Sequence, residues 1–154
     1  MTFLPDVNVW VALAAERHVH HSIARLWFGS LQDEDVAFCR LTQMGFLRLL
    51  TNKHVMREEV LGPAGAWSAY RALRSDRRVV YLLEPGHFSE DGWETFTEGQ
   101  STSPNRWTDA YLSALAHAAR LTLVTFDTKM LARQGANCLV LGAASGESSG
   151  ANDP

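Results

Sequence analysis

The 154-residue chain is long enough to form one domain with its own hydrophobic core, so neither disulfides nor a structural metal is needed to hold the fold together. Hydrophobic residues make up 46% of the chain and charged residues 20%, a composition that excludes disordered, collagen-like and coiled-coil proteins. The net charge of −3 gives no bulk signal for a nucleic-acid partner, which would have to be held by local contacts.

Short apolar runs bounded by turn residues alternate with longer segments of helical period along the chain. This alternation predicts an α/β fold, in the form of a single three-layer α/β/α domain with a mainly parallel five-stranded sheet. In chain order we expect strand 2–5, helices 7–16 and 21–32, strand 36–39, helices 41–51 and 63–75, strand 79–83, helices 88–98 and 107–120, strand 121–125, helix 128–134 and strand 138–141. Residues 1–141 would form the domain. Residues 142–154 have no large apolar side chain and are expected to form a disordered tail.

The sequence carries no feature of an inserted or secreted protein. No window reaches the roughly 18 consecutive apolar residues of a membrane helix, and residues 1–6 lack the charged start of a signal peptide. Cys39 and Cys138 each lie in a short apolar run, where a free thiol acts as a small hydrophobic group. We therefore expect a cytoplasmic protein, because the reducing cytoplasm favours free thiols.

Three aspartates are predicted to lie at one edge of the sheet. Asp6 ends the first strand, Asp127 follows the fourth strand, and Asp109 opens the helix before that strand. In an open parallel sheet, the carboxyl ends of the strands and the adjoining helix starts form the crevice where ligands bind. The alternative is that each aspartate only caps a helix by accepting hydrogen bonds from free amides.

The position of Asp109 in its helix favours convergence over capping. Its neighbours three, four and seven residues further on are Leu112, Ser113 and Ala116, so it lies beside an apolar stripe and points partly inward. Clustered carboxylates repel each other unless a cation neutralises them, and hard oxygen ligands suit Mg²⁺ or Mn²⁺. A divalent metal site is therefore the economical interpretation.

Gln43 is a second polar residue expected to point inward, because it shares a helix face with Phe46, Leu47 and Leu50. An apolar stripe led by one Gln indicates either a satisfied core amide or a group that lines the crevice. Both interpretations stay open from the sequence. In the crevice, Gln43 would offer a neutral oxygen and two donors in place of a fourth carboxylate.

Four motifs follow the predicted strands or open the late helix: DVNV at 6–9, LTQMGFLRL at 41–49, TDAYL at 108–112 and TFD at 125–127. In order and spacing they resemble the PIN-domain ribonuclease toxins of the VapC group, from residue 2 to about residue 141. The resemblance implies a Mg²⁺- or Mn²⁺-dependent endoribonuclease that acts on RNA, is commonly a homodimer and is held inactive by a small VapB-type antitoxin. The metal-binding acids of the family fall on Asp6, Asp109 and Asp127. Its remaining acidic position, usually Glu, falls on Gln43, which would orient a water in catalysis.

This departure at Gln43 removes one carboxylate and favours a one-metal site or weaker metal affinity. A branch of the family resembles the chain in having Thr-Gln-x-Gly-Phe at this point, so the change does not by itself imply inactivity. Glu90 and Asp91 either supply the missing charge or form a solvated helix start. Asn8 either bonds a metal-bound water or forms a turn, and Arg48 either meets a phosphate or lies on a solvated helix face.

Histidines and tryptophans offer further candidates for RNA contact. His18, His20 and His21 lack nearby cysteines and do not have the spacing of a structural zinc site, so we expect a polar turn or an RNA contact there. Most of the five tryptophans should lie in the core or an interface, since Trp10 and Trp27 share helix faces with apolar residues, and only Trp93 and Trp107 are candidates to stack on bases at the rim of the crevice.

Two other classes of function remain open from the sequence. One is a phosphoacceptor or phosphatase-like domain that uses Asp6, although Asn8 stands where a dehalogenase-like enzyme would have Asp. A receiver-like domain would also need a Lys at the end of strand 138–141, which the sequence lacks. The other is a catalytically silent binding module, with Gln43 as the sign of lost activity.

Overall fold

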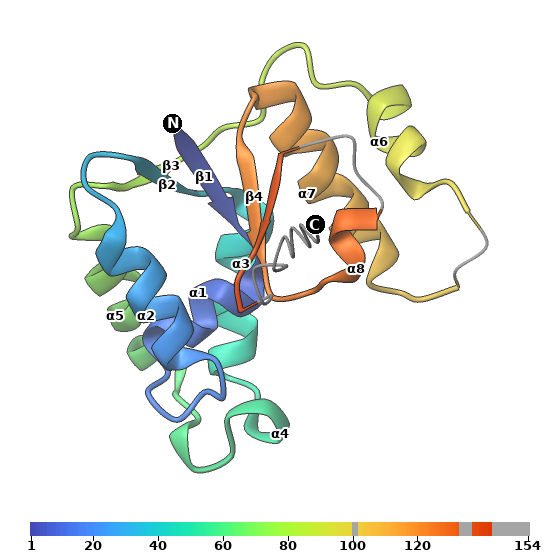
Figure 1. Cartoon of the computed structure of the whole chain (residues 1–154). Coiled ribbons are helices and arrows are strands. Elements are labelled where there is room, and N and C mark those ends of the chain that lie inside the picture. The colour runs from blue at the N-terminus through green and yellow to red at the C-terminus, as the bar shows by residue number, and fades with distance from the viewer. Residues whose placement is uncertain (100–101, 133–136, 143–154) are drawn as a thin grey trace, which may run out of the picture.

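The computed structural model describes residues 1–99, 102–132 and 137–142, and the predicted tail beyond 142 lies outside the described residues. Its five strands are β1 (Thr2–Pro5), β2 (Asp35–Phe38), β3 (Val79–Tyr81), β4 (Thr122–Thr125) and β5 (Cys138–Val140). They form one parallel sheet in the order β3-β2-β1-β4-β5 (Figure 1). The predicted fold class and the five predicted strands are confirmed.

Strand β1 lies at the centre of the sheet, between β2 and β4. Phe3 pairs with Val36 of β2, and Pro5 pairs with Val124 of β4. Pro5 ends the strand, as expected for a residue that cannot donate to the ladder. The next amide, that of Asp6, donates to the Val124 carbonyl at 2.8 Å, so the sheet itself fixes Asp6 at its carboxyl edge.

The helices follow the predicted order with small shifts at their ends. They are α1 (Val7–Ala14), α2 (His21–Ser30), α3 (Arg40–Leu50), α4 (Lys53–Met56), α5 (Pro63–Arg74), α6 (Glu90–Thr97), α7 (Arg106–Ala119) and α8 (Lys129–Ala132), with a 3-10 turn η1 (Arg57–Glu59). Helix α4 and turn η1 were not predicted from the sequence. Both are shorter than two turns and carry no apolar period. Asn52 starts α4 by accepting the His54 amide at 2.9 Å.

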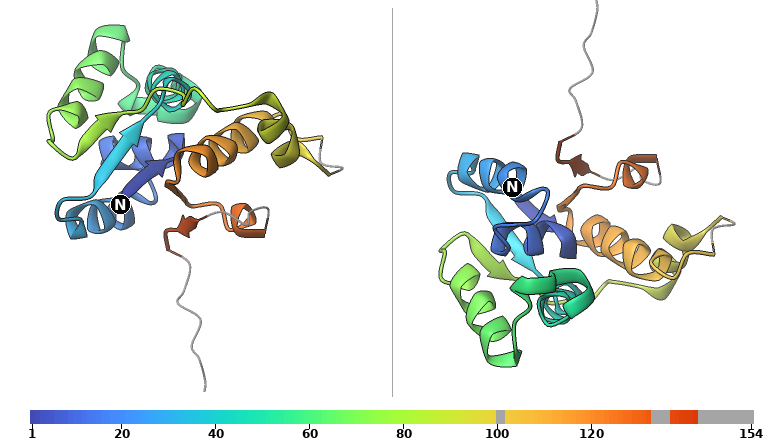
Figure 2. Two further views of the ribbon diagram at one scale, coloured as in Figure 1. Left: turned by 90° about the horizontal axis from the view of Figure 1, so that it is seen from above. Right: turned by 90° about the horizontal axis from the view of Figure 1, so that it is seen from below.

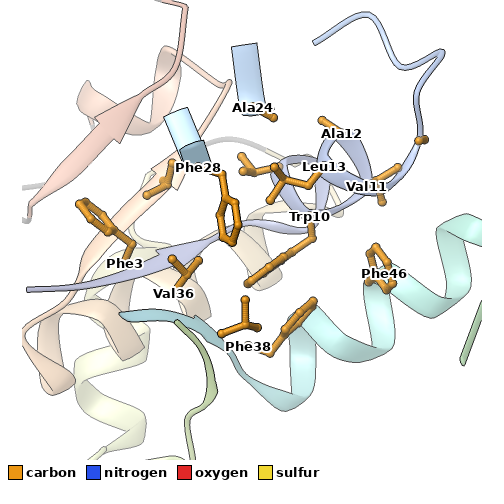
Figure 3. Close-up of a cluster of buried hydrophobic side chains, with 14 of the residues drawn as sticks. Phe3, Trp10, Val11, Ala12, Leu13, Ala24, Phe28, Val36, Phe38 and Phe46 are labelled. Carbon is orange, nitrogen blue, oxygen red and sulfur yellow. The ribbon is translucent and has the colours of Figure 1, made fainter. Parts of the chain in front are cut away.

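Helices cover both faces of the sheet and give three layers. Figure 2 shows α1, α2, α3 and α5 on one side of the sheet and α7, with α6 outside it, on the other. The first face is filled by large aromatic residues: Trp10 of α1 stacks on Phe38 of β2 with ring centroids 3.6 Å apart (Figure 3). The second face is aliphatic, with Leu115 of α7 packed in a cluster with Leu123 of β4. Among the described helices, none combines the length and apolar character needed to cross a membrane.

A close approach of α1 and α3 depends on Gly45. A Cβ atom at this position would lie 2.5 Å from Cγ2 of Val7, a separation that side chains do not tolerate. Without a side chain, α3 packs directly against the start of α1. This contact sets the width of the space between the two helices at the carboxyl edge of the sheet.

Candidate active site

A cavity of about 350 Å³ opens at the carboxyl edge of the sheet, between the starts of α1 and α7 and one face of α3. The polar and charged residues that line it are Asp6, Asn8, Arg48, Asn52, Asn105, Thr108 and Asp109. Two of the three predicted acids, from positions more than 100 residues apart, therefore meet in one cavity, as the strand-end argument predicts. The cationic side chain of Arg48 lines the same cavity.

Asp6 is held by hydrogen bonds to both of its carboxylate oxygens. As the N-cap of α1, its Oδ1 accepts the Val9 amide at 3.0 Å, and its Oδ2 accepts the hydroxyl of Thr125. Burial raises the pKa of the Asp6 carboxyl from 3.8 to about 6; the charge of Asp109 adds to the rise, and the two hydrogen bonds oppose it. Asp6 therefore caps α1, and its ionised carboxylate lowers the free energy of unfolding of the protein.

Asp109 does not cap its helix, and in this respect the capping interpretation is wrong for it. Helix α7 begins at Arg106, so Asp109 is its fourth residue, with Asn105 at the cap position. The Asp109 amide donates to the Asn105 carbonyl at 3.0 Å. The side chain is half-buried and lines the cavity, as its place beside the apolar stripe predicts.

Asp127 is not among the described residues that line this cavity. It is exposed, and its Oδ1 accepts the Lys129 amide at 2.9 Å, as the capping interpretation expects. Its own amide donates to Oγ1 of Thr125 at 3.1 Å, so Thr125 links Asp127 to Asp6. After burial, the charges of Asp6 and Asp127 both raise the pKa of Cys138, which places both carboxylates near this thiol.

Gln43 faces away from the cavity. It is buried, and its Oε1 accepts a hydrogen bond from Nη1 of Arg40 at 2.7 Å. Among the described residues that line the cavity, α3 contributes Leu41, Gly45, Arg48 and Leu49, but not Gln43. This geometry corresponds to the satisfied core amide, the first of the two interpretations that the sequence left open.

Arg48 lies on the face of α3 that meets the cavity, and Asn52, the N-cap of α4, also lines the cavity. Together with Gly45, they follow the spacing of one helix face that continues into the cap of α4. Arg48, expected from the sequence to be a phosphate contact or a solvated residue, is exposed and lines the cavity. Asn52, Asn105 and Thr108 were not expected in the site. Spacing was the available signal for two of them, because Asn52 lies four residues after Arg48 and Asn105 lies four residues before Asp109.

The aromatic and histidine candidates lie outside the cavity lining. His20 stacks on Phe126 at 4.4 Å between ring centroids, and Nδ1 of His21 lies 2.7 Å from the Ala12 carbonyl oxygen. Trp93 is half-buried and donates its indole N–H to the Trp107 carbonyl at 3.2 Å, which is a structural role. Trp107 is 63% exposed at the start of α7. Glu90 and Asp91 are exposed in the first turn of α6.

Comparison with known proteins gives the family. The model of the PIN domain matches residues 3–136 of the chain. Ribonuclease VapC41 of Mycobacterium tuberculosis is 41% identical over 129 residues, covering 81% of this chain and 88% of that protein. The chain belongs to the PIN-domain family, among the VapC-type ribonuclease toxins of toxin–antitoxin systems. Ribonuclease VapC38 of the same organism is 35% identical over 124 residues, covering 80% of this chain and 84% of that protein.

Two solved structures of VapC proteins show the same fold. VapC20 of Mycobacterium tuberculosis, a Sarcin-Ricin loop cleaving toxin, has a TM-score of 0.61 at 19% identity and covers 84% of this chain and 93% of its own. VapBC2 from Rickettsia felis, bound to a DNA fragment from its promoter, has a TM-score of 0.61 at 13% identity, covering 92% and 99%. Because the sequence identities are below 20%, these two structures support a shared fold and nothing further.

The two acids that line the cavity of this VapC-type chain are suitable ligands for a divalent cation. Burial and the neighbouring charge of Asp109 both disfavour the ionised form of Asp6, and a cation between the two carboxylates would relieve both effects. Carboxylate oxygens and neighbouring amide oxygens such as that of Asn8 are the hard ligands that Mg²⁺ and Mn²⁺ prefer. Within the described part of the chain, no group of three or more His, Cys, Asp or Glu is arranged to hold a metal. Water molecules would therefore complete the coordination.

Proposed function

We propose that this VapC-type chain is a Mg²⁺- or Mn²⁺-dependent endoribonuclease whose reaction takes place between Asp6 and Asp109. The observation that carries the proposal is that two repelling carboxylates and the cation Arg48 line one cavity. The carboxylates favour a divalent ion, and a guanidinium beside them favours the phosphate group of the substrate. PIN-domain membership also favours a nuclease over the phosphoacceptor alternative.

Each residue has a distinct role in this proposal. Asp6 and Asp109 would hold the ion, which would polarise the phosphoryl oxygen and lower the pKa of the attacking water. Arg48 binds a phosphate oxygen, and the side-chain amide of Asn8 either offers its oxygen to the ion or accepts a hydrogen bond from the attacking water. The amide of Asp127 donates to Oγ1 of Thr125 and so directs the Thr125 hydroxyl proton to Asp6. Asp127 is thus a positioning residue, and Gln43 takes no part.

Cleavage of a fluorescently labelled single-stranded RNA tests this proposal. We expect wild-type protein to cleave with Mg²⁺ or Mn²⁺ and to stop in EDTA. Asp109→Asn should lower the rate by more than about 100-fold, because loss of a direct ligand exceeds the 10–100-fold effect typical of outer-shell partners. Asp91→Asn, on exposed α6, is the matched control and should keep the wild-type rate. Metal-independent cleavage, or full activity of Asp109→Asn, would contradict the assignment.

We further propose that the active protein is a cytoplasmic homodimer and that a small VapB-type antitoxin inhibits it. Membership of the VapC group supports this proposal. Sedimentation of the isolated chain should give a dimer, and co-expression with a small protein encoded next to it should give an inactive complex. A stable monomer that no such protein binds or inhibits would contradict it. A catalytically silent binding module would bind a partner without any Mg²⁺- or Mn²⁺-dependent cleavage.

A further inference from the structure

A pair of arginines flanks one tyrosine ring beside the cavity. Arg40 is the first residue of α3, Arg74 is the last residue of α5, and Tyr81 is the last residue of β3. The guanidinium carbon of Arg40 lies 5.5 Å from the centroid of the Tyr81 ring, and that of Arg74 lies 5.9 Å from it. Two cations from different helices are therefore held near one ring.

The charges of these two arginines are not neutralised within the described structure. The ion pairs formed by the described residues join Arg17 to Glu58, Arg77 to Asp33 and Arg78 to Asp76, and none of them includes Arg40 or Arg74. Gln43, which is neutral, fixes Arg40 through its Oε1 at 2.7 Å. A neutral acceptor holds the guanidinium in place and leaves its positive charge available.

Two hydrogen-bonding groups in this cluster also lack partners. Among the described residues, Nη1 of Arg74 and the hydroxyl of Tyr81 are buried without a hydrogen bond. Leaving such a group unsatisfied typically costs about 1–3 kcal/mol. Water could satisfy these donors, but it could not neutralise two neighbouring cations. An anion would do both after a small movement of the side chains.

The cluster lies on the same edge of the sheet as the catalytic cavity. Asp6 follows the end of β1, Arg40 follows β2 closely, and Tyr81 ends β3, and these strands are consecutive neighbours in the sheet. With neighbouring strands about 4.8 Å apart, the end of β3 lies on the order of 10 Å from the end of β1. Leu41, next to Arg40, already lines the cavity. A chain that enters the cavity and continues along this edge would reach the arginines.

We propose that Arg40, Arg74 and Tyr81 form a second phosphate-binding site, which holds the RNA strand at a phosphate outside the cleaved bond. The inference rests on the proposed ribonuclease function. Arginine binds phosphate oxygens through paired N–H groups, and the Tyr81 hydroxyl adds a donor. The place of the cluster beside the cavity favours the substrate strand over an acidic segment of a protein partner. Gln43 is the positioning residue of this site.

Substrate length provides the sharpest test. We would compare wild type, Arg40→Gln, Arg74→Gln and the double variant on RNA oligonucleotides extended stepwise on the 5′ or 3′ side of the cleavage position. For extended substrates, the double variant should raise KM about 10-fold with little change in kcat. The slope of the logarithm of its RNA-binding constant against the logarithm of salt concentration should fall by about one to two units in magnitude. The shortest cleavable substrate should show no difference. Arg71→Gln, on the same helix with its guanidinium over Trp67, is the matched control and should match wild type.

Several outcomes would overturn the second site. Equal losses on short and extended substrates would show a structural role, and an unchanged KM with an unchanged salt dependence would show no role in RNA binding. Weaker binding of a protein inhibitor with unaffected RNA cleavage would assign the cluster to a protein partner instead. If a variant fails to fold, Arg40→Lys keeps the charge but loses the paired donors, and it should give a smaller length-dependent rise in KM.

A binding measurement separates this proposal from the ribonuclease assignment itself. Fluorescence anisotropy with extended RNA in the Asp109→Asn background requires no cleavage. Weaker binding on adding Arg40→Gln and Arg74→Gln would support the second site even if the catalytic assignment failed. Wild-type cleavage with no effect of these two substitutions on binding would leave the ribonuclease assignment intact and overturn the second site.

Discussion

Asp6→Asn should make the metal-free protein more stable at neutral pH while removing its activity. The pKa of Asp6 is about 6 in the folded state against 3.8 ordinarily, a difference of about 2 units. At about 1.4 kcal/mol per unit, ionised Asp6 lowers the free energy of unfolding by about 3 kcal/mol above pH 6. Asn caps a helix as well as Asp does and keeps an acceptor for the Val9 amide. Asn has one acceptor oxygen instead of two, so the Thr125 hydroxyl loses its acceptor, which offsets about 1 kcal/mol.

The net gain is therefore about 2 kcal/mol at pH 7.5, or on the order of 4–8 °C in Tm for a domain of this size. The sign of the pH dependence follows from the raised pKa. Between about pH 4 and pH 6 the folded state binds more protons at Asp6 than the unfolded state does, so wild-type stability falls as pH rises through this window. Asp6→Asn should lack this component.

Urea unfolding in EDTA from pH 4 to pH 8, for wild type and Asp6→Asn, measures the effect. The other carboxyl groups titrate in both proteins, so the difference between the two curves isolates Asp6. Asp35→Asn, at an exposed site at the start of β2, is the control and should follow wild type. Adding Mn²⁺ at 100 times its Kd should stabilise wild type by about 2.7 kcal/mol and Asp6→Asn much less. A pH-independent loss of stability in Asp6→Asn would refute the reasoning and leave Asp6 as a simple helix cap.

Two further substitutions test the geometry around α3. Gln43→Glu should leave Mn²⁺ affinity unchanged in calorimetric titrations, because the new carboxylate would pair with Arg40 outside the cavity; tighter Mn²⁺ binding would return this position to the metal site. Gly45→Ala should lower stability by up to about 2 kcal/mol in melting curves, because overpacking against Val7 outweighs the gain of about 1 kcal/mol in helix propensity. Gly29→Ala, where a Cβ meets nothing within 4 Å, should instead raise stability by about 0.5–1 kcal/mol. Equal stabilisation by both alanines would disprove the close approach of α1 and α3.

The convergence of Asp6 and Asp109 could be predicted from the sequence because it depends on topology. In a parallel sheet, every strand ends at the same edge, so a carboxylate after a strand and one at a helix start are brought together without knowledge of side-chain packing. The inward direction of Asp109 followed from helical period alone. Both inferences use regularities that hold whatever the neighbouring residues are.

The direction of Gln43 could not be predicted in this way. Helix α3 has two buried sides at its start, one against α1 at Gly45 and one toward α5 at Tyr70. Periodicity groups Gln43 with Phe46 and Leu50 but does not say which neighbour that stripe meets. Phe46 and Leu50 belong to the aromatic core with Tyr70, so Gln43 is turned to that side. The direction of the Gln43 side chain is therefore set by the packing of α3 against α5, and not by the sequence of α3 alone.

The order of the strands separates the charges that RNA cleavage would need. The acids Asp6 and Asp127 follow β1 and β4 in the middle of the sheet, whereas Arg40 and Tyr81 lie at the ends of β2 and β3 on one side. A metal ion would be held at the centre and a phosphate to one side, about two strand spacings apart. Pairing of single arginines with single phosphates needs no net positive charge on the whole protein, because each cation acts on one phosphate through direct contact. A chain with a net charge of −3 can then hold an anionic strand. RNA binding through the few contacts at this edge should then depend strongly on salt concentration, and the rest of the surface should contribute little to RNA affinity.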